Sequence, residues 1–247
     1  MRSSVCMAVF NGAMYLRPQL QSILDQLGPA DELIVSDDCS TDASVMIIES
    51  MHDQRVRLIK NAKRLGYVRN FERALERASG ELVFLSDQDD VWIANKLARM
   101  KQALIANPDA AMAHHERILI DAAGRVIGRG PELGDGMRGG MSFVAREFFK
   151  PRLWGCALAL RASTVRLMLP FPPAVYAHDH WATIVAALSG GVLFVPEPLI
   201  EHRAHDANVT PKHGLSWYRR IVVRTRFLQM ILYALRRQYV KRNILIK

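Results

Sequence analysis

ELVFLSDQDDVW, residues 81–92, is an apolar run that ends in three aspartates, Asp87, Asp89 and Asp90. The apolar part has the length and bulk of a buried β-strand. Three carboxylates at one strand end repel one another, so a metal ion or a basic side chain is expected beside them. A turn followed by a helix cap would account for one or two of the aspartates, but not for all three.

The sequence before this run alternates between strand and helix patterns. Short apolar runs at 4–10, 32–36 and 56–60 predict three more strands, and helical patterns at 14–26, 43–51 and 68–78 separate them. This order predicts a parallel sheet with right-handed crossovers, which binds its ligand at the carboxyl ends of its strands. Polar residues follow these strands at Asn11-Gly12, Asp37-Asp38 and 87–90, so they are expected on one rim.

The second half is less regular and predicts a mixed arrangement. We expect a hairpin from 111–120 and 125–127, a mobile glycine-rich loop at 128–140, a strand at 153–160, a helix at 179–188, and strands at 192–195 and 199–202. No G-x-G-x-x-G follows the first strand and no G-x-x-x-x-G-K-[ST] occurs. Dinucleotide and P-loop phosphate sites are therefore not expected.

The composition predicts a single large domain in a reducing compartment. Half of the 247 residues are hydrophobic, and no Pro/Gly/Ser-rich linker divides the chain. Three widely spaced cysteines, Cys6, Cys39 and Cys156, give no metal-ligand spacing and are expected to be core residues. The first residues lack the apolar region of a signal peptide, which predicts a cytoplasmic protein.

The net charge of +9 is concentrated in the last part of the chain. Residues 211–247 contain ten Lys or Arg and no Asp or Glu, whereas the remainder carries 23 basic and 24 acidic residues. The body of the protein is thus nearly neutral, which argues against a nucleic-acid partner.

A D-x-D pair at a strand end can direct two carboxylates to one point. Such oxygen ligands suit Mg²⁺ or Mn²⁺, which keep positions open for substrate phosphates. A metal there would stabilise a leaving diphosphate. The D-x-D is a weak signal alone, and Asp37-Asp38 on the same rim strengthens it.

Several motifs, in order and spacing, resemble the inverting glycosyltransferases of family 2, which have the GT-A fold. VFNGAMYL (9–16), IVSDDCSTD (34–42) and FLSDQDDVW (84–92) resemble their donor-binding half. NAKRLGYVRNFERAL (61–75) resembles a stretch of the rhamnosyltransferase-like members, and WGCALALR (154–161), HDHW (178–181) and HRAHDANV (202–209) resemble later motifs. The resemblance covers roughly residues 4–210. It implies an α/β, Rossmann-like GT-A domain with a mixed sheet at 1–210 and a basic amphipathic helical tail at 211–247.

The resemblance also implies roles for individual residues. Asn11 would lie near the nucleotide, Asp37 or Asp38 would contact the base or ribose, Asp87 would lie near the ribose and the metal, and Asp89 would be the principal metal ligand. The implied nucleotide-sugar-binding set is Phe10, Asn11, Asp37, Asp38, Asn70, Asp87 and Arg203. His205 would complete the metal set with Asp87 and Asp89, or would bind the diphosphate. Asp90 is expected in a turn or at a helix start.

Displacement at an anomeric carbon needs a carboxylate that deprotonates the acceptor hydroxyl. Asp179 in AHDHWAT matches the family's acidic residue at the start of a helix, and a simple helix N-cap is the alternative. Many members have Glu-Asp where this chain has His178-Asp179. Trp154, Gly155, His178 and Trp181 would form the acceptor side, although core packing is an equally good explanation for the two tryptophans. His52, His114 and His115 are interpreted as structural.

The basic tail predicts an amphipathic helix. Trp217, Ile221, Leu228, Ile231, Leu232, Leu235 and Tyr239 fall on one side of a helical wheel, and Arg219, Arg226, Arg237 and Lys241 fall on the other. The apolar stretch is too short to cross a bilayer, which needs about 20 residues. The helix could lie on the inner face of the cell membrane through residues 215–245, or pack on the domain.

The motifs predict a metal-dependent transferase that moves a sugar from a nucleotide-diphosphate donor to a glycan or lipid-linked acceptor. The rhamnosyltransferase-like segment favours dTDP-L-rhamnose, and bacterial surface polysaccharide synthesis is implied by the resemblance. A haloacid-dehalogenase-type phosphatase with Asp87 as nucleophile is one alternative, because D-x-D-x-[TV] also matches 87–91. A non-catalytic nucleotide- or glycan-binding module is another.

Overall fold

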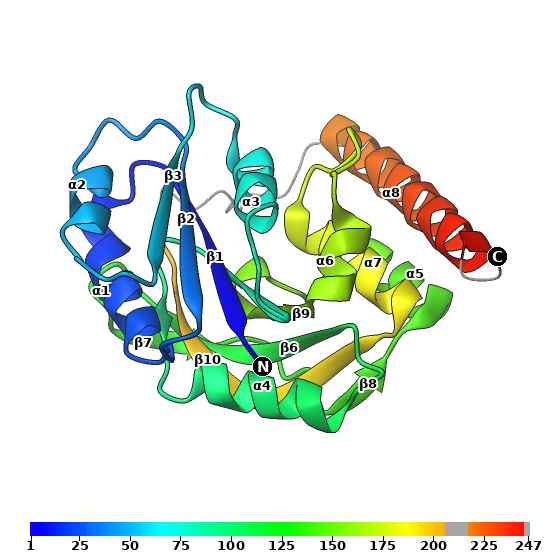
Figure 1. The fold of residues 1–247 in the computed structure, drawn as a ribbon. Helices are drawn as coiled ribbons and strands as arrows, with labels where there is room; N and C mark the ends of the chain where they lie inside the picture. Colours follow the sequence, from blue (N-terminus) through cyan, green and yellow to red (C-terminus); the bar gives the residue numbers. More distant parts are fainter. Residues whose placement is uncertain (206–216, 245–247) are drawn as a thin grey trace.

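The computed structural model describes residues 1–205 and 217–244, and its first half alternates strands and helices as expected (Figure 1). β1, β2 and β4 are almost entirely buried, which fits their apolar sequences, whereas the edge strand β3 is partly exposed. The elements are β1 (Ser3–Val9), α1 (Ala13–Leu24), β2 (Glu32–Asp37), α2 (Ser44–Glu49), β3 (Val56–Lys60), α3 (Tyr67–Leu75) and β4 (Leu82–Ser86).

The second half adds short strands and helices to the same sheet. They are β5 (Val91–Trp92), α4 (Lys96–Ala106), β6 (Met112–Ile120), β7 (Val126–Arg129), β8 (Gly136–Arg138), α5 (Gly140–Phe149), the 3₁₀ helix η1 (Gly155–Ala157), β9 (Leu158–Arg161), α6 (Ala162–Met168), α7 (His178–Ser189), β10 (Val192–Arg203) and α8 (Trp217–Ile244).

The strands form one mixed sheet in the order β3-β2-β1-β4-β9-β6-β10-β5, with β7 beside β6 and β8 beside β10. The parallel pairs are β1 with β2, β1 with β4, β2 with β3, and β6 with β10. β9 runs antiparallel between β4 and β6. The α/β architecture with a mixed sheet confirms the predicted fold class, and the carboxyl ends of β1, β2 and β4 share one edge.

Three predictions about the second half were wrong in detail. The glycine-rich segment at 128–140 is not a free loop, because β8 lies in it and pairs with β10. The two strands expected at 192–195 and 199–202 are one strand, β10, whose register shifts twice around Pro196 and Pro198. Proline cannot donate to a ladder, so the bulges let the strand continue. The strand predicted at 153–160 begins only at Leu158.

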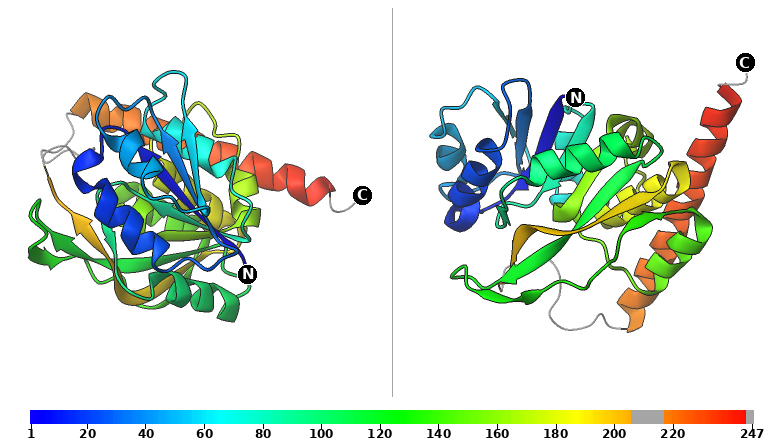
Figure 2. Two further views of the ribbon diagram at one scale, coloured as in Figure 1. Left: turned by 60° about the vertical axis from the view of Figure 1, so that its left-hand side comes forward. Right: turned by 90° about the horizontal axis from the view of Figure 1, so that it is seen from below.

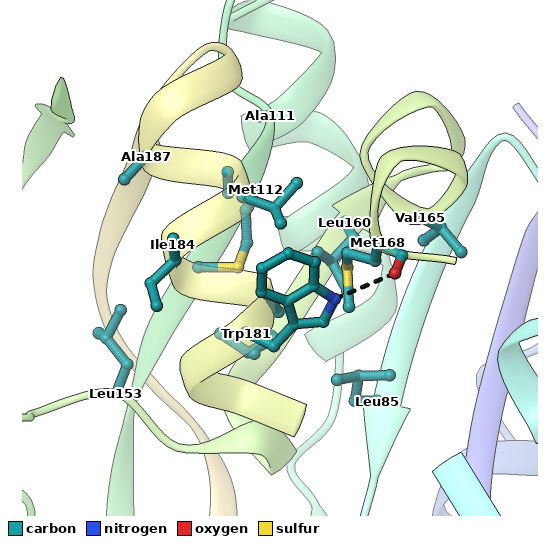
Figure 3. Close-up of a cluster of buried hydrophobic side chains, with 14 of the residues drawn as sticks. Leu85, Ala111, Met112, Leu153, Leu160, Val165, Met168, Trp181, Ile184 and Ala187 are labelled. Atoms are coloured by element: carbon teal, nitrogen blue, oxygen red, sulfur yellow. Dashed lines mark hydrogen bonds between the residues drawn. The ribbon is translucent and has the colours of Figure 1, made fainter. Parts of the chain in front are cut away.

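Apolar side chains fill both faces of the sheet. One cluster lies under α1 and α4, and the other lies among α3, α5, α6, α7 and α8. Trp181 is fully buried in the second cluster, and its indole nitrogen donates to the Met168 carbonyl at 3.0 Å (Figure 3). Of the two explanations for Trp181, core packing is therefore correct and the acceptor-side role is wrong.

Helix α8 lies against α7 at the edge of the molecule, and its C-terminal end projects beyond the body (Figure 2). Phe227, Met230, Ile231 and Ala234 are buried in the same cluster as Trp181. The tail thus packs on the domain through one face. In the part of the chain that the structure describes, no helix has the length and apolar character needed to cross a membrane.

Candidate active site

The ends of β1 and β4 are joined by one side chain. The amide oxygen of Gln88 accepts a hydrogen bond from the Phe10 backbone N–H at 2.8 Å, and its nitrogen donates to the Phe10 carbonyl at 3.2 Å. A Cβ on Gly12 would stand 2.5 Å from that amide oxygen, so a glycine is required for this approach. Gln88 therefore fixes the segment after β1 to the acidic turn after β4.

Asp37 and Asp38 follow β2 and have different surroundings. The Asp38 carboxylate is buried and accepts hydrogen bonds from the backbone N–H groups of Leu65 and Gly66 at 2.6 and 2.8 Å. Asp37 accepts from the Ser40 N–H through Oδ2 at 3.1 Å, and its buried Oδ1 has no partner among the described residues. Asp38 thus holds the start of α3, whereas Asp37 keeps an acceptor available.

Asn11 and Asn70 lie on different sides of this rim. Asn11 is exposed, and its Oδ1 accepts from the Thr41 N–H at 2.8 Å. Asn70 is buried and its amide donates to the Val9 and Ser36 carbonyls at 3.2 and 2.8 Å, which ties β1 to β2. Asn70 therefore supports the rim from beneath, so direct contact with a nucleotide sugar, as the resemblance implied, does not fit its position.

The three aspartates after β4 lie in a partly closed acidic site. Burial and the neighbouring Asp90, Asp89 and Asp179 carboxylates hold the pKa of Asp87 well above its usual range. Burial and Asp90 also raise the pKa of Asp89, against the opposing effect of His205. The raised pKa values mean that burial and the neighbouring carboxylates disfavour the charged form of Asp87 and Asp89, and that nearby positive charge compensates only in part.

Asp90 has a structural environment, as expected. It is fully buried, and its Oδ1 accepts from the Arg203 backbone N–H at 3.0 Å and lies 3.1 Å from His202 Nδ1. Burial alone would raise the pKa of Asp90, but the hydrogen bond and charge of His202, the Arg203 N–H and Cys156 together outweigh it and lower the pKa. Cys156 lies beside this pair, and the ligand atoms of Asp90, Cys156 and His202 lie within 4.8 Å of one another. Asp90 thus links the acidic turn to the end of β10.

The basic side chain beside the aspartates is Lys96, at the start of α4. It is fully buried, donates to the Cys156 carbonyl at 2.7 Å and lies 4.3 Å from the centre of the Trp92 ring. Burial lowers the pKa of Lys96 to about 8, although Cys156, Asp90 and Asp87 act in the opposite direction. One lysine offsets only part of the charge of the carboxylates around it.

Asp89 and His205 form the most direct pair of candidate metal ligands. His205 Nε2 lies 2.8 Å from Asp89 Oδ2, and Tyr15 lies beside the imidazole with ring centres 5.1 Å apart. Carboxylate oxygens with one imidazole nitrogen suit a divalent cation such as Mn²⁺. Asp89 and His205 therefore offer a pair of ligands that fits a metal ion. Among the described residues, the ligand atoms of Asp87 do not join this pair within 4.8 Å, so its place in the predicted metal set stays a prediction.

Arg203 fixes the turn that carries Asp89. Its Nε donates to the Asp89 carbonyl at 2.9 Å, and its Nη1 donates to the Asp121 and Ala122 carbonyls at 3.1 and 3.3 Å. The guanidinium also lies over the Tyr15 ring at 4.7 Å. The structure therefore shows Arg203 positioning this turn, and a contact with phosphate stays a prediction.

Asp179 lies in the first turn of α7 on the other side of the site. It is half-buried, and its Oδ1 accepts from the His180 N–H at 2.8 Å. Tyr67, at the start of α3, connects the two sides: burial and the charges of Asp179 and Asp87 raise the pKa of its hydroxyl to about 12. That hydroxyl donates to the Tyr176 carbonyl at 2.6 Å, which ties α3 to the segment before α7.

The other predicted acceptor-side residues lie beside Asp179. His178 is buried and stacks on Phe71 with ring centres 3.9 Å apart, and burial lowers its pKa to about 4. A Cβ on Gly155 would stand 2.5 Å from His178 Nε2, so these two residues touch. Trp154 is half-buried, and the Arg117 guanidinium lies 3.4 Å from its ring centre. Trp154 also packs against the cluster under α1 and α4, so its acceptor-side role stays a prediction.

The comparisons with known proteins decide the family. The model of "Glycosyl transferase family 2" matches residues 4–147. The chain belongs to glycosyl transferase family 2. This membership sets aside the phosphatase alternative, because Asp87 lies in the family 2 match and follows β4 rather than the first strand.

Relatives of this family 2 chain occur in several bacteria. It is 28% identical over 217 residues to an uncharacterized glycosyltransferase of Nostoc, covering 84% of this chain and 66% of the relative. It is 32% identical over 104 residues to an Escherichia coli UDP-Glc:alpha-D-GlcNAc-diphosphoundecaprenol beta-1,3-glucosyltransferase, covering 42% and 41%. A Shigella flexneri dTDP-rhamnosyl transferase is 29% identical over 108 residues, covering 41% and 37%. The chain thus spans less than two thirds of the length of these relatives.

Solved structures support the same fold. Staphylococcus aureus TarS 1–349 in complex with UDP-GlcNAc superposes with a TM-score of 0.71 at 18% identity, covering 97% of this chain and 73% of that TarS fragment. A mannosyltransferase from Pyrobaculum calidifontis in complex with GDP-Man and Mn²⁺ gives a TM-score of 0.58 at 20% identity, covering 80% and 57%. The sheet of this family 2 chain is therefore an arrangement found in other sugar-transferase structures.

Sequence reasoning on this family 2 chain missed Lys96, His202 and Tyr67 as parts of the site. Lys96 begins an amphipathic helix, and a lysine in such a helix is expected to be solvent-exposed. His202 appeared only as a replacement for a tyrosine, and its contact with Asp90 depends on the pairing of β10 with β5. Tyr67 lay inside a recognised motif, but nothing in the spacing brings it near Asp179.

Proposed function

We propose that the protein is an inverting glycosyltransferase that moves a sugar from a nucleotide-diphosphate donor to an acceptor hydroxyl. The observation that carries this proposal is the arrangement of two acidic sides around one site. Asp87 and Asp89 follow β4, and His205 lies beside Asp89. On the other side, the charge of Asp179 on α7 helps to raise the pKa of Asp87 and of Tyr67. Direct displacement needs a leaving-group side and a base side separated in this way.

In the proposed reaction the Asp179 carboxylate takes the proton of the acceptor hydroxyl. The hydroxyl oxygen forms a bond to the anomeric carbon, and the bond from that carbon to the diphosphate oxygen breaks. The nucleoside diphosphate leaves with the bonding electron pair. The Asp179 carboxylate is held at Oδ1 by the His180 N–H, which orients it for this role.

On the leaving-group side, Asp87, Asp89 and His205 would hold Mg²⁺ or Mn²⁺. A bound divalent cation supplies charge stabilisation for the departing diphosphate. Gln88 and Arg203 support this side by holding Phe10 and the Asp89 turn in place. The exposed Asn11 and the available Asp37 oxygen are the proposed contacts to the nucleoside.

The proposed donor is dTDP-L-rhamnose. The segment NAKRLGYVRNFERAL and the similarity to the Shigella dTDP-rhamnosyl transferase support this choice. The similarity to an E. coli glucosyltransferase that uses UDP-Glc supports UDP-glucose as the next donor to test. The proposed acceptor is a glycan or lipid-linked glycan of bacterial surface polysaccharide synthesis, as in the name of that E. coli relative, at the inner face of the cell membrane.

A panel of nucleotide sugars tests the proposal. Each donor is incubated with the protein in the presence of Mg²⁺, Mn²⁺ or a chelator, and release of nucleoside diphosphate is measured. We expect release from one donor class that depends on the metal. Hydrolysis of phosphate monoesters without any effect on nucleotide sugars would overturn the proposal, and donor binding without turnover would point to a binding module.

A further inference from the structure

Helix α8 has one face docked on the domain. Phe227, Met230, Ile231 and Ala234 pack into the core beside α7. Arg237 strengthens this docking, because its guanidinium donates to the carbonyls of Leu167 and Met168 at 2.7 and 2.6 Å. Arg237 is therefore not a solvated residue of a free basic face, as the helical wheel suggested. The docked face fixes the direction in which the rest of α8 points.

A second apolar face of α8 remains exposed. Ile221, Leu228, Leu232, Leu235 and Tyr239 recur at intervals of seven, four, three and four residues, so they form a stripe along the helix. Their exposed fractions range from 41% to 70%. Trp217 begins the same stripe and is 75% exposed. The wheel predicted this stripe correctly, but it wrongly included Ile231, which belongs to the docked face.

The charge around the stripe indicates what covers it. Arg224 and Arg236 are exposed beside this stripe, whereas Arg219 and Arg226 are exposed on the opposite side of the helix, and residues 211–247 contain no Asp or Glu. Two copies paired along this stripe would bring arginines together with no carboxylate in the helix to oppose them. An anionic lipid surface instead attracts arginines, takes leucine side chains, and suits tryptophan and tyrosine at its boundary.

The docked face also connects α8 to the base side of the site. The Phe227 ring lies against His180, with ring centres 5.9 Å apart, and His180 follows Asp179 directly. The Tyr176 hydroxyl and His180 Nδ1 are 2.6 Å apart, which braces the same turn. The docked face of α8 therefore contacts the turn that carries Asp179.

We propose that the exposed stripe of α8 and the flanking Arg224 and Arg236 dock the protein on an anionic lipid bilayer, the surface in which a lipid-linked acceptor would be held. The role of the acceptor rests on the proposed function, whereas the docking itself does not. α8 then acts as a surface anchor that lies in the plane of the headgroups.

Vesicle flotation with the full chain tests the docking. The vesicles are phosphatidylcholine alone, or phosphatidylcholine mixed with phosphatidylglycerol. We expect binding only to the anionic vesicles, with weaker binding at high salt. The triple variant Leu228→Gln, Leu232→Gln, Leu235→Gln should bind at least about tenfold more weakly. The double variant Arg224→Gln, Arg236→Gln should weaken binding about thirtyfold.

A matched triple variant provides the control. Met46→Gln, Ile105→Gln, Ile127→Gln removes exposed apolar side chains from other elements and should leave flotation unchanged. Equal flotation of the native and Leu228/Leu232/Leu235 proteins would overturn the proposal. A dimer seen by light scattering that the leucine variant dissociates would also overturn it, in favour of a second copy. Donor hydrolysis in solution is measured in parallel, so that loss of the proposed function is distinguished from loss of docking.

Discussion

His205 Nε2 lies 2.8 Å from Asp89 Oδ2, although 116 residues separate the two in the sequence. Asp89 follows β4 and His205 follows β10, and Arg203 binds the Asp89 carbonyl from the same strand end. The contact therefore joins the acidic turn to the last strand of the sheet. It is the structural basis for treating Asp89 and His205 as a pair of candidate metal ligands.

Replacing His205 should weaken the binding of the metal that the proposed reaction needs, without changing the fold. His205→Asn should raise the Mn²⁺ concentration for half-maximal nucleoside diphosphate release at least about tenfold. A metal titration of donor turnover measures this shift. The control is His52→Asn, because His52 is exposed and its φ of 48° suits asparagine. An unchanged metal titration would remove His205 from the ligand set.

Asp179→Asn tests the proposed base. Loss of general base catalysis should lower turnover by about 10²–10⁴-fold, while the affinity for the donor stays the same. Steady-state release of nucleoside diphosphate and calorimetric donor binding separate these two effects. Asp109→Asn replaces an exposed aspartate and should change neither. Full turnover by Asp179→Asn would show that Asp179 is only a helix-start residue.

Asp37 and Asp38 should respond differently to the same substitution. Asp38→Asn replaces one carboxylate oxygen with an NH2 group, so one of the Leu65 and Gly66 N–H groups loses its acceptor and the free energy of unfolding should fall by about 1–3 kcal/mol. Asp37→Asn should mainly weaken donor binding, since its Oδ1 has no partner among the described residues. Urea unfolding and donor calorimetry measure both variants. Equal effects on stability, with no difference in donor affinity, would contradict the assignment.

The sequence was sufficient for the donor half of the fold and for its strand-end residues. The apolar runs before Asn11, Asp37 and Asp87 are continuous and end at obvious breaks, and parallel strands must place those ends on one edge. The predicted boundaries of β2 and β3 differ from the structure by at most one residue. Local pattern and global topology agree in this half, so local reasoning works.

Contacts between distant elements could not be predicted. Lys96 is buried because α4 packs against the sheet next to the acidic turn, and its own helix gives no sign of this. The two apolar faces of α8 overlap on a helical wheel, and only the packing of Phe227 and Met230 separates them. The two prolines at 196 and 198 predict a strand break from the sequence. The bulges that let β10 continue depend on its pairing with β6, which the sequence does not show.

Lys96→Met should destabilise the protein, because it leaves buried carboxylates without their nearby cation. The expected loss is about 3–5 kcal/mol in the free energy of unfolding, measured by urea denaturation. Mn²⁺ should then stabilise this variant more than it stabilises the native protein in thermal melts. Lys63→Met replaces an exposed lysine and should stay within about 0.5 kcal/mol. If Lys96→Met also changed the free energy of unfolding by no more than about 0.5 kcal/mol, Lys96 would not compensate the charge of the carboxylates.

Glu32 should control part of the stability at acid pH. Its buried carboxylate accepts from Ser4 Oγ at 2.6 Å, from the Ser79 N–H and Oγ at 2.9 and 2.6 Å, and from Arg57 at 2.8 Å. Burial alone would raise the pKa of Glu32, but these hydrogen bonds outweigh it and lower the pKa to about 2.

A folded pKa below the unfolded value of about 4.3 means that the charged carboxylate stabilises the fold above that pH. This stabilisation is lost as the pH falls from about 5 towards 2. Glu32→Gln should therefore lower the free energy of unfolding by about 1–3 kcal/mol at pH 7 and flatten its decline in acid. Glu49→Gln breaks only the exposed pair with Lys60 and should keep the native pH profile. Parallel acid profiles for Glu32→Gln and the native protein, measured by urea unfolding, would refute the role of Glu32.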